Sequence, residues 1–126
     1  MLEHPLPVAP ALPPQRLCAS AELAEKGLAI VFDVIHYREP ARAFAMRFDG
    51  KVVVYLNRCV HVPTELDWQP GEFFDVAGLY LVCSTHGAIF EPKTGLCVAG
   101  PCRGASLEPL QVREQGGEVF LVDDKP

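Results

Sequence analysis

Apolar residues along the chain fall into short runs that are separated by turn residues. The runs at 28–38, 41–48 and 51–56 are rich in Ile, Val, Phe and Tyr, and Asp49-Gly50 separates the last two. An Asp-Gly pair between two such runs is the strongest short-range signal of a β-hairpin. Helical periodicity does not extend beyond a turn or two. The pattern therefore predicts an all-β fold of short antiparallel strands.

Shorter elements are expected on both sides of this hairpin. Ser20 and Gly27 are placed to cap and to stop one helical turn. Further strands are expected at residues 79–82, 107–112 and 119–122, with a turn at 115–117 between the last two. Loops are expected after the run that ends at Leu56 and after the one that ends at Val82.

The N-terminal residues differ from the rest of the chain. Residues 1–16 hold five of the 12 prolines, a density that prevents a helix and favours an extended arm. The total of 126 residues fits one domain with a real core. We therefore expect a Pro-rich arm at 1–16 and a single domain at 17–126.

Composition and charge exclude several classes of partner. The chain is 49% hydrophobic and 21% charged, with a net charge of -5 at pH 7 and no run of Lys or Arg, so nucleic acid and anionic membrane are not expected partners. Its apolar runs are far shorter than the roughly 20 residues of a membrane helix. The N-terminus lacks the basic start and apolar region of a secretion signal, which indicates a cytoplasmic location. Five cysteines in such a chain suggest metal binding before disulfides.

Two of these cysteines lie in motifs that also contain a histidine. The motifs are Asn57-Arg58-Cys59-Val60-His61 and Cys83-Ser84-Thr85-His86-Gly87. Each one begins as a predicted strand ends, so each loop offers one thiolate and one imidazole a few ångströms apart. Two facing loops of this kind suit a two-iron cluster in which one iron takes both thiolates and the other takes both imidazoles.

The paired motifs resemble those of the Rieske family. The pattern Cys-x-His and Cys-x-x-His-Gly is followed by Phe90, Thr94-Gly95 and Gly100-Pro101, and the likeness covers roughly residues 28–122. It implies a Rieske fold of stacked antiparallel sheets with a cluster-binding subdomain at one tip, whose loops span about 57–104 and in which Gly100-Pro101 covers the cluster. It also implies a 2Fe-2S cluster. The implied ligands are Cys59, His61, Cys83 and His86.

Several positions depart from the respiratory members of this family. Those proteins carry a Ser and a Tyr that donate hydrogen bonds to the cluster, where this chain has Ala88 and Phe90, and a disulfide whose partners fall here at Thr64 and Thr85. Donors aimed at sulfur stabilise the reduced, more negative cluster. Without them we expect a potential near the low end of the family range, about −150 mV, as in the ferredoxin-like branch.

The expected function is that of a one-electron carrier, a Rieske ferredoxin between a reductase and a terminal oxygenase or another redox enzyme. The chain is not expected to be an enzyme itself, because an oxygenase needs a large second domain. Three alternatives stay open: a redox-sensing or regulatory Rieske module, a structural zinc site with two Cys and two His ligands, and a catalytic cysteine with a histidine base.

The remaining cysteines and one insertion have no assigned role. Cys97 and Cys102 bracket the covering loop and could be a disulfide, a redox pair or buried thiols, of which the last is favoured; Cys18 is expected to be an apolar filler. The insert at 62–78 is longer than is usual in the family. Its residues Trp68, Phe73 and Phe74 are expected to pack on the domain, with a type II turn at Pro70-Gly71. Its acidic residues could alternatively form a rim on which a basic partner docks: Glu65, Asp67 and Glu72.

Overall fold

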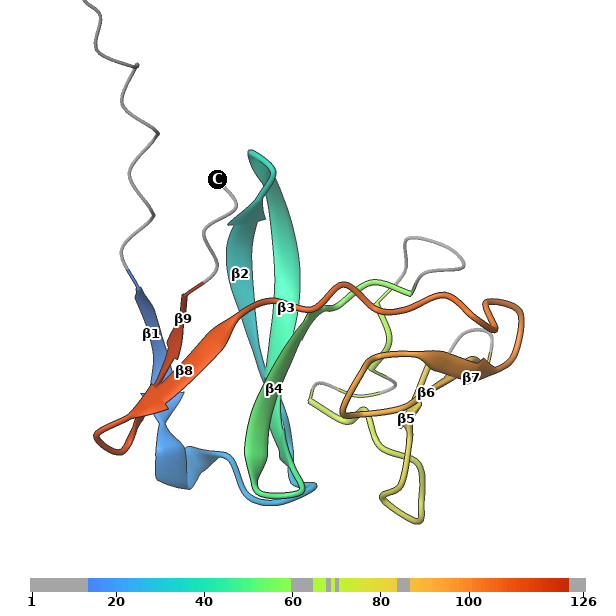
Figure 1. Ribbon diagram of the computed structural model, residues 1–126, viewed down its shortest axis with the longest axis horizontal. Coiled ribbons are helices and arrows are strands. Elements are labelled where there is room, and N and C mark those ends of the chain that lie inside the picture. Colours follow the sequence, from blue (N-terminus) through green and yellow to red (C-terminus); the bar gives the residue numbers. More distant parts are fainter. Residues whose placement is uncertain (1–13, 60–64, 68, 70, 84–86, 123–126) are drawn as a thin grey trace, which may run out of the picture.

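The computed structural model describes residues 14–59, 65–67, 69, 71–83 and 87–122. In this part of the chain, short strands form three antiparallel sheets of three strands each (Figure 1). In chain order the elements are β1 (Gln15–Ala19), the 3-10 helix η1 (Ser20–Glu22), β2 (Ile30–His36), β3 (Glu39–Phe48), β4 (Lys51–Leu56), β5 (Leu81–Val82), β6 (Ile89–Phe90), β7 (Cys97–Ala99), β8 (Val112–Gln115) and β9 (Glu118–Leu121). The predicted all-β class is confirmed.

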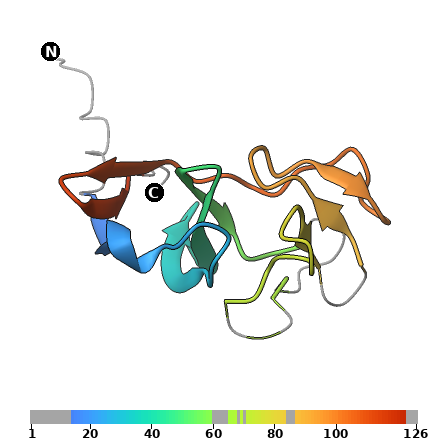
Figure 2. The ribbon, with the colours of Figure 1, turned by 90° about the horizontal axis from the view of Figure 1, so that it is seen from below.

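The three sheets follow one another along the molecule. Their strand orders are β1-β9-β8, β2-β3-β4 and β5-β6-β7. Figures 1 and 2 show β1, β8 and β9 at one end of the long axis and the small sheet β5-β6-β7 at the other. Cys59 and Cys83 pack in one core with Leu81, Phe90 and Cys97 of this small sheet. A cluster-binding subdomain at one tip is thus the architecture that the sequence predicts.

The predicted hairpin at Asp49-Gly50 joins β3 to β4. Phe48 pairs with Lys51, which leaves a two-residue loop in which Asp49 has φ 55° and Gly50 has φ 80°. Positive φ at both central residues is the type I′ turn, whose twist matches that of the flanking strands. The local signal in the sequence is therefore confirmed.

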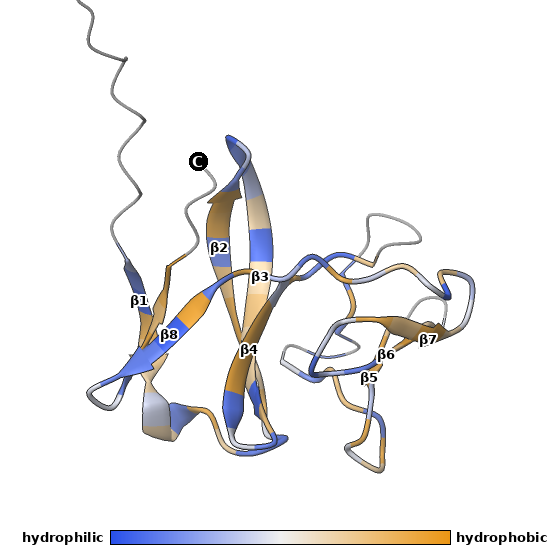
Figure 3. Ribbon diagram, viewed as in Figure 1, coloured by the Kyte–Doolittle hydropathy of each residue, from blue (hydrophilic) through white to orange (hydrophobic). Residues whose placement is uncertain are grey.

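The central strand of the middle sheet, β3, is buried on both faces over residues 43–46. Ala43 and Ala45 of β3 belong to the core shared with the terminal sheet, whereas Phe44 and Met46 belong to the core that contains Cys59 and Cys83. All four residues are at most 1% exposed. Successive side chains of a strand point to opposite faces, so β3 separates two cores. Figure 3 shows the apolar residues along β4 and the hydrophilic residues at the hairpin tips.

The prediction of a strand at 107–112 is wrong. β8 begins only at Val112, and the preceding residues form only an isolated antiparallel bridge to β4, in which Pro109 lies opposite Tyr55. There, Leu56 donates its N–H to the Glu108 carbonyl at 3.0 Å and Leu110 donates to the Val54 carbonyl at 2.9 Å. Pro109 lies between these two bonds and has no N–H to donate to a ladder. Residues 108–110, which lead into β8, are thus hydrogen-bonded to the last residues of β4.

The N-terminal elements also differ from expectation. The helical turn begins at Ser20, but its N-cap is Ala19 and it ends at Glu22, well before Gly27. The Glu22 carboxylate accepts the Ala19 N–H at 2.8 Å, which replaces the predicted serine cap. Strand β1 was not expected, and its first residue, Gln15, pairs with Leu121.

Aromatic residues of the insert pack on the domain, as predicted. Phe73 is 1% exposed and stacks on Phe44 with ring centroids 3.9 Å apart. Phe74 stacks on Phe48 at 6.0 Å. Gly71 has φ 81°, as position i+2 of a type II turn requires. Trp68 and Pro70 lie outside the described residues.

Within the described residues, none of the helical structure is long and apolar enough to cross a membrane.

Candidate metal centre

The first thiol of the predicted site is placed by the end of β4. Asn57 donates its backbone N–H to the Arg42 carbonyl at 2.8 Å, which continues the β3–β4 ladder by one bond, and the Arg58 N–H then turns back to the Leu56 carbonyl at 2.9 Å. Cys59 follows and is only 2% exposed. The strand therefore ends three residues before the cysteine, which lies in the core.

A buried amide anchors this first loop to the insert. Asn57 is 5% exposed and is the buried polar residue of the described chain. Its Oδ1 accepts the Leu66 N–H at 2.9 Å and its Nδ2 donates to the Asp67 carboxylate at 3.1 Å. The other oxygen of Asp67 accepts the Gly71 N–H at 3.2 Å. Asp67, expected on an acidic rim, thus holds the insert against the cysteine loop.

The second thiol lies in a tight loop between β5 and β6. Cys83 donates its N–H to the Ala88 carbonyl at 2.9 Å, and Gly87 donates to the Cys83 carbonyl at 2.9 Å. Gly87 has φ 69°, a conformation that glycine adopts without strain. Cys83 is fully buried. A short hairpin therefore closes directly behind this cysteine.

The Gly100-Pro101 loop rests on the second cysteine loop. A Cβ on Gly100 would lie 2.8 Å from the Cα of Ala88, and its φ is 99°. Only glycine allows so close an approach with that backbone conformation. Ala99 pairs with Ile89 in the adjacent strands β7 and β6. The expectation that this loop covers the Cys-His motifs is consistent with the contact to Ala88.

The described residues fit the thiolate half of a two-iron site. Cys59 and Cys83 are both thiols, both are buried, and both belong to the same core, together with Leu66, Phe73 and Phe90. His61 and His86 lie outside the described residues. Among the residues that are described, no three His, Cys, Asp or Glu side chains form a metal site. The full ligand set of Cys59, His61, Cys83 and His86 therefore stays a prediction.

Apolar side chains occupy the positions of the missing hydrogen-bond donors. Ala88 and Phe90 are both fully buried, on the loop and strand that follow Cys83. Thr64 and Thr85, where the respiratory proteins have a disulfide, lie outside the described residues. The low reduction potential stays a prediction, which is based on Ala88 and Phe90.

Tyr55 joins the middle sheet to the cluster-binding end and was not identified from the sequence. Its hydroxyl donates to the Pro92 carbonyl at 2.7 Å within the core. Burial raises the pKa of this hydroxyl to about 12, and the charge of Glu91 adds to the effect. A Cβ on Gly95 would lie 2.8 Å from the Tyr55 ring. The tyrosine thus packs into the turn between β6 and β7.

The three remaining cysteines occupy two different places. Cys18 is 2% exposed in the other core, and burial raises the pKa of its thiol, as an apolar filler requires. Cys97 and Cys102 lie in the cluster-side core, and the Cys102 Sγ is 2.9 Å from the Cys97 Sγ. Of the three roles considered from the sequence, the structure has two buried free thiols, as favoured, and it adds their direct contact.

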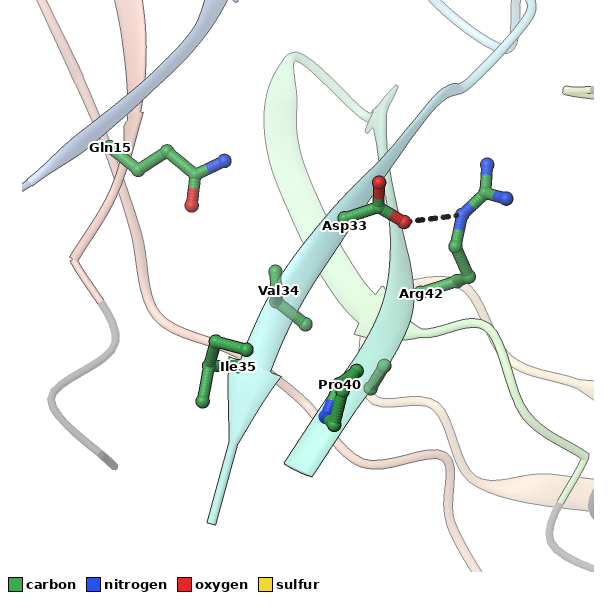
Figure 4. A pocket seen from close by; sticks show the side chains of 7 residues that line it. Gln15, Asp33, Val34, Ile35, Pro40 and Arg42 are labelled. Atoms are coloured by element: carbon green, nitrogen blue, oxygen red, sulfur yellow. Dashed lines mark ion pairs between the residues drawn. The ribbon is translucent and has the colours of Figure 1, made fainter. Parts of the chain in front are cut away.

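A surface pocket of about 520 Å³ lies between β1, β2 and β3 (Figure 4). It is lined by Gln15, Asp33, Val34, Ile35, Pro40, Ala41 and Arg42. Its charged residues, Asp33 and Arg42, pair with each other at 3.2 Å and are exposed. None of the predicted ligands lines it. The pocket therefore contributes nothing to the candidate metal centre.

Comparison with known proteins agrees with the motifs. Residues 13–120 match the family described as Rieske [2Fe-2S] domain. The ferredoxin of carbazole 1,9a-dioxygenase from Nocardioides aromaticivorans IC177 has a similar fold, with 24% identity and a TM-score of 0.68 over 87% of this chain and 97% of that one.

Two further solved structures have the same fold. The terminal oxygenase of carbazole 1,9a-dioxygenase from Novosphingobium sp. KA1 is 23% identical with a TM-score of 0.69, over 90% of this chain but only 30% of the oxygenase chain. A chain in the complex of reduced oxygenase and oxidized ferredoxin in carbazole 1,9a-dioxygenase is 20% identical with a TM-score of 0.67, over 90% of this chain and 95% of that one. No curated protein sequence matches this chain. Both ferredoxins and oxygenases therefore contain this fold.

Proposed function

The chain belongs to the Rieske family of 2Fe-2S proteins, and from this premise we propose that it is a ferredoxin that carries one electron at a time from a reductase to a terminal oxygenase or another redox enzyme. The observation that carries the proposal is the pair of buried thiols, Cys59 and Cys83, at the ends of β4 and β5 within the matched domain. The bound cluster would supply the one-electron chemistry.

Four residues would hold the cluster. We assign one iron to the Cys59 and Cys83 thiolates and the other to the His61 and His86 imidazoles, as the family pattern implies. Two neutral imidazoles in place of two thiolates remove negative charge and make an added electron less costly. The chain's own contribution is to keep the two thiolates dry inside a packed core.

Burial and the lack of donors lower the tendency of the site to accept an electron. Reduction adds negative charge, which an apolar surrounding stabilises poorly. Ala88 and Phe90 offer no hydrogen bond to offset this cost. A potential near the low end of the Rieske range suits a carrier that a reductase must fill and that passes its electron on.

Oxygenase systems supply a parallel for a partner. The similar structures include a ferredoxin in complex with its oxygenase in carbazole 1,9a-dioxygenase, at an identity that supports the fold alone. Around the first cysteine loop of this chain, Arg58 and Glu65 are both exposed. The docking surface would therefore carry charges of both signs. Because salt screens the attraction between such a surface and a partner with complementary charges, electron transfer should slow as ionic strength rises.

The cofactor and its carrier role can be tested in one preparation. Anaerobically purified protein should contain iron and acid-labile sulfide and give an EPR signal after reduction by dithionite. It should also carry electrons from an NADH-dependent ferredoxin reductase to cytochrome c. Cys83→Ser should abolish both properties, whereas Cys18→Ser, in the other core, should change neither. Bound zinc without iron, or a reducible cluster that the reductase cannot fill, would contradict the proposal.

A further inference from the structure

The sulfur atoms of Cys97 and Cys102 lie unusually close to each other. The Cys102 thiol donates a hydrogen bond to the Cys97 Sγ, and the two sulfur atoms lie 2.9 Å apart, closer than two sulfur atoms in ordinary van der Waals contact. A disulfide bond needs a separation of about 2.05 Å. A movement of less than about 1 Å would therefore join the two atoms.

The backbone around both cysteines holds them in this arrangement. Cys97 donates its N–H to the Ala105 carbonyl at 2.7 Å, and its own carbonyl accepts the Gly104 N–H at 3.0 Å. The Cys102 carbonyl accepts the Ala105 N–H at 2.9 Å. Both cysteines are thus fixed by the same short turn. Such preorganisation gives one thiol a high effective concentration at the other.

From this geometry we propose that Cys97 and Cys102 form a reversible dithiol–disulfide couple, a second redox site beside the cluster. This goes beyond electron transfer by the cluster, because the couple exchanges two electrons with thiol reagents. The oxidant it would use is a low-molecular-weight disulfide of the glutathione type.

The exchange proceeds in two steps. Cys102, which is 8% exposed against 1% for Cys97, attacks the small disulfide through Sγ and releases one small thiol. The Cys97 Sγ then attacks the Cys102 Sγ, forms the internal S–S bond and releases the second small thiol. The two cysteines lose two electrons and two protons, and both are gained by the two released thiols.

Burial slows this exchange. Burial, and after it the hydrogen bond to Cys97, raises the pKa of the Cys102 thiol, so little of the reactive thiolate is present near neutral pH. The couple should therefore equilibrate slowly with the glutathione pool. It is expected to respond to sustained changes in redox conditions and not to brief ones.

The couple is placed to act on the cluster-binding loops. Gly100 lies between the two cysteines in sequence and rests on Ala88 of the second loop. The disulfide would close residues 97–102 into a ring and restrain that contact. Cys102 also lies within electrostatic reach of the first predicted thiolate, Cys59.

The test uses the cluster-loaded protein in anaerobic glutathione buffers of graded ratio. Equilibrium should be approached from fully reduced and from fully oxidised protein, followed by acid quench, alkylation and intact mass. Oxidation should lower the mass by about 2 Da and protect only Cys97 and Cys102 from alkylation, while the visible spectrum of the cluster persists. Peptide mapping should place the bond between these two residues.

Single substitutions provide the controls. Cys97→Ser and Cys102→Ser should each prevent the mass loss, whereas Cys18→Ser should behave as the wild type does. The proposal is overturned if both thiols stay reactive at every buffer ratio, if the mass loss survives either substitution, or if the bond forms only with Cys59 or Cys83 after cluster loss. None of these readouts depends on electron delivery to a partner, so the proposed carrier function is tested separately.

Discussion

Asn57 connects the first cysteine loop to the insert, and its replacement by alanine should loosen both. Its side chain makes two hydrogen bonds, one from the buried Leu66 N–H at 2.9 Å and one to the Asp67 carboxylate at 3.1 Å. Asn57→Ala removes both hydrogen bonds at once. The Leu66 N–H is then left in the core without an acceptor, and Asp67 retains its bond from Gly71 alone.

The cost can be worked out from the two bonds. A buried donor without a partner costs about 1–3 kcal/mol, and a hydrogen bond to a half-buried carboxylate contributes about 1 kcal/mol. The sum is about 2–4 kcal/mol. For a domain of this size, about 1 kcal/mol shifts the unfolding midpoint by roughly 4 °C. We therefore expect Tm to fall by about 8–16 °C.

Thermal unfolding of the cluster-loaded protein, followed by circular dichroism and visible absorbance, measures this change. Cluster release makes unfolding irreversible, so all variants must be heated at the same rate. Asp33→Asn, which breaks an exposed ion pair, is the matched surface control and should change Tm by less than about 2 °C. If Asn57→Ala lowered Tm no more than this control, the anchoring role of Asn57 would be refuted.

Three further changes test the packing, the electrostatics and the potential. Tyr55→Phe should cost about 1–2 kcal/mol of stability, seen as a lower Tm, because the buried Pro92 carbonyl loses the hydroxyl that donates to it. An unchanged Tm would contradict this. The hydrogen bond from Arg47 is the largest cause that lowers the pKa of Glu114, to about 2, below its unfolded value of about 4.3. The stability that Glu114 contributes is therefore present above the unfolded pKa and lost as pH falls from about 4.3 towards 2. Because this ion pair is partly exposed, Glu114→Gln should cost at most about 1 kcal/mol at neutral pH, and the difference in Tm from the wild type should shrink through that window; a constant difference would count against it. Ala88→Ser with Phe90→Tyr should raise the midpoint potential in protein-film voltammetry, and an unchanged or lower midpoint would sink that argument.

Local sequence signals predicted the parts of this protein that neighbouring residues decide. The Asp49-Gly50 turn needs only positive φ at two successive residues, and the structure has it. The expected strand at 107–112 was wrong, because a run of apolar residues does not show that Pro109 pairs with β4 through an isolated bridge only. Strand β1 had no signal of its own, since its partner β9 lies at the other end of the chain.

The sequence by itself determined the family and its cofactor, because ligand types and their spacing within two short loops are local properties that the chain spells out. The tertiary structure alone decided which distant groups meet. It brought Asn57 to the insert and set Tyr55 against the turn at Pro92. The physical reason is that such contacts depend on how three sheets pack around two cores, and ångström-scale approaches of this kind follow from packing and not from spacing.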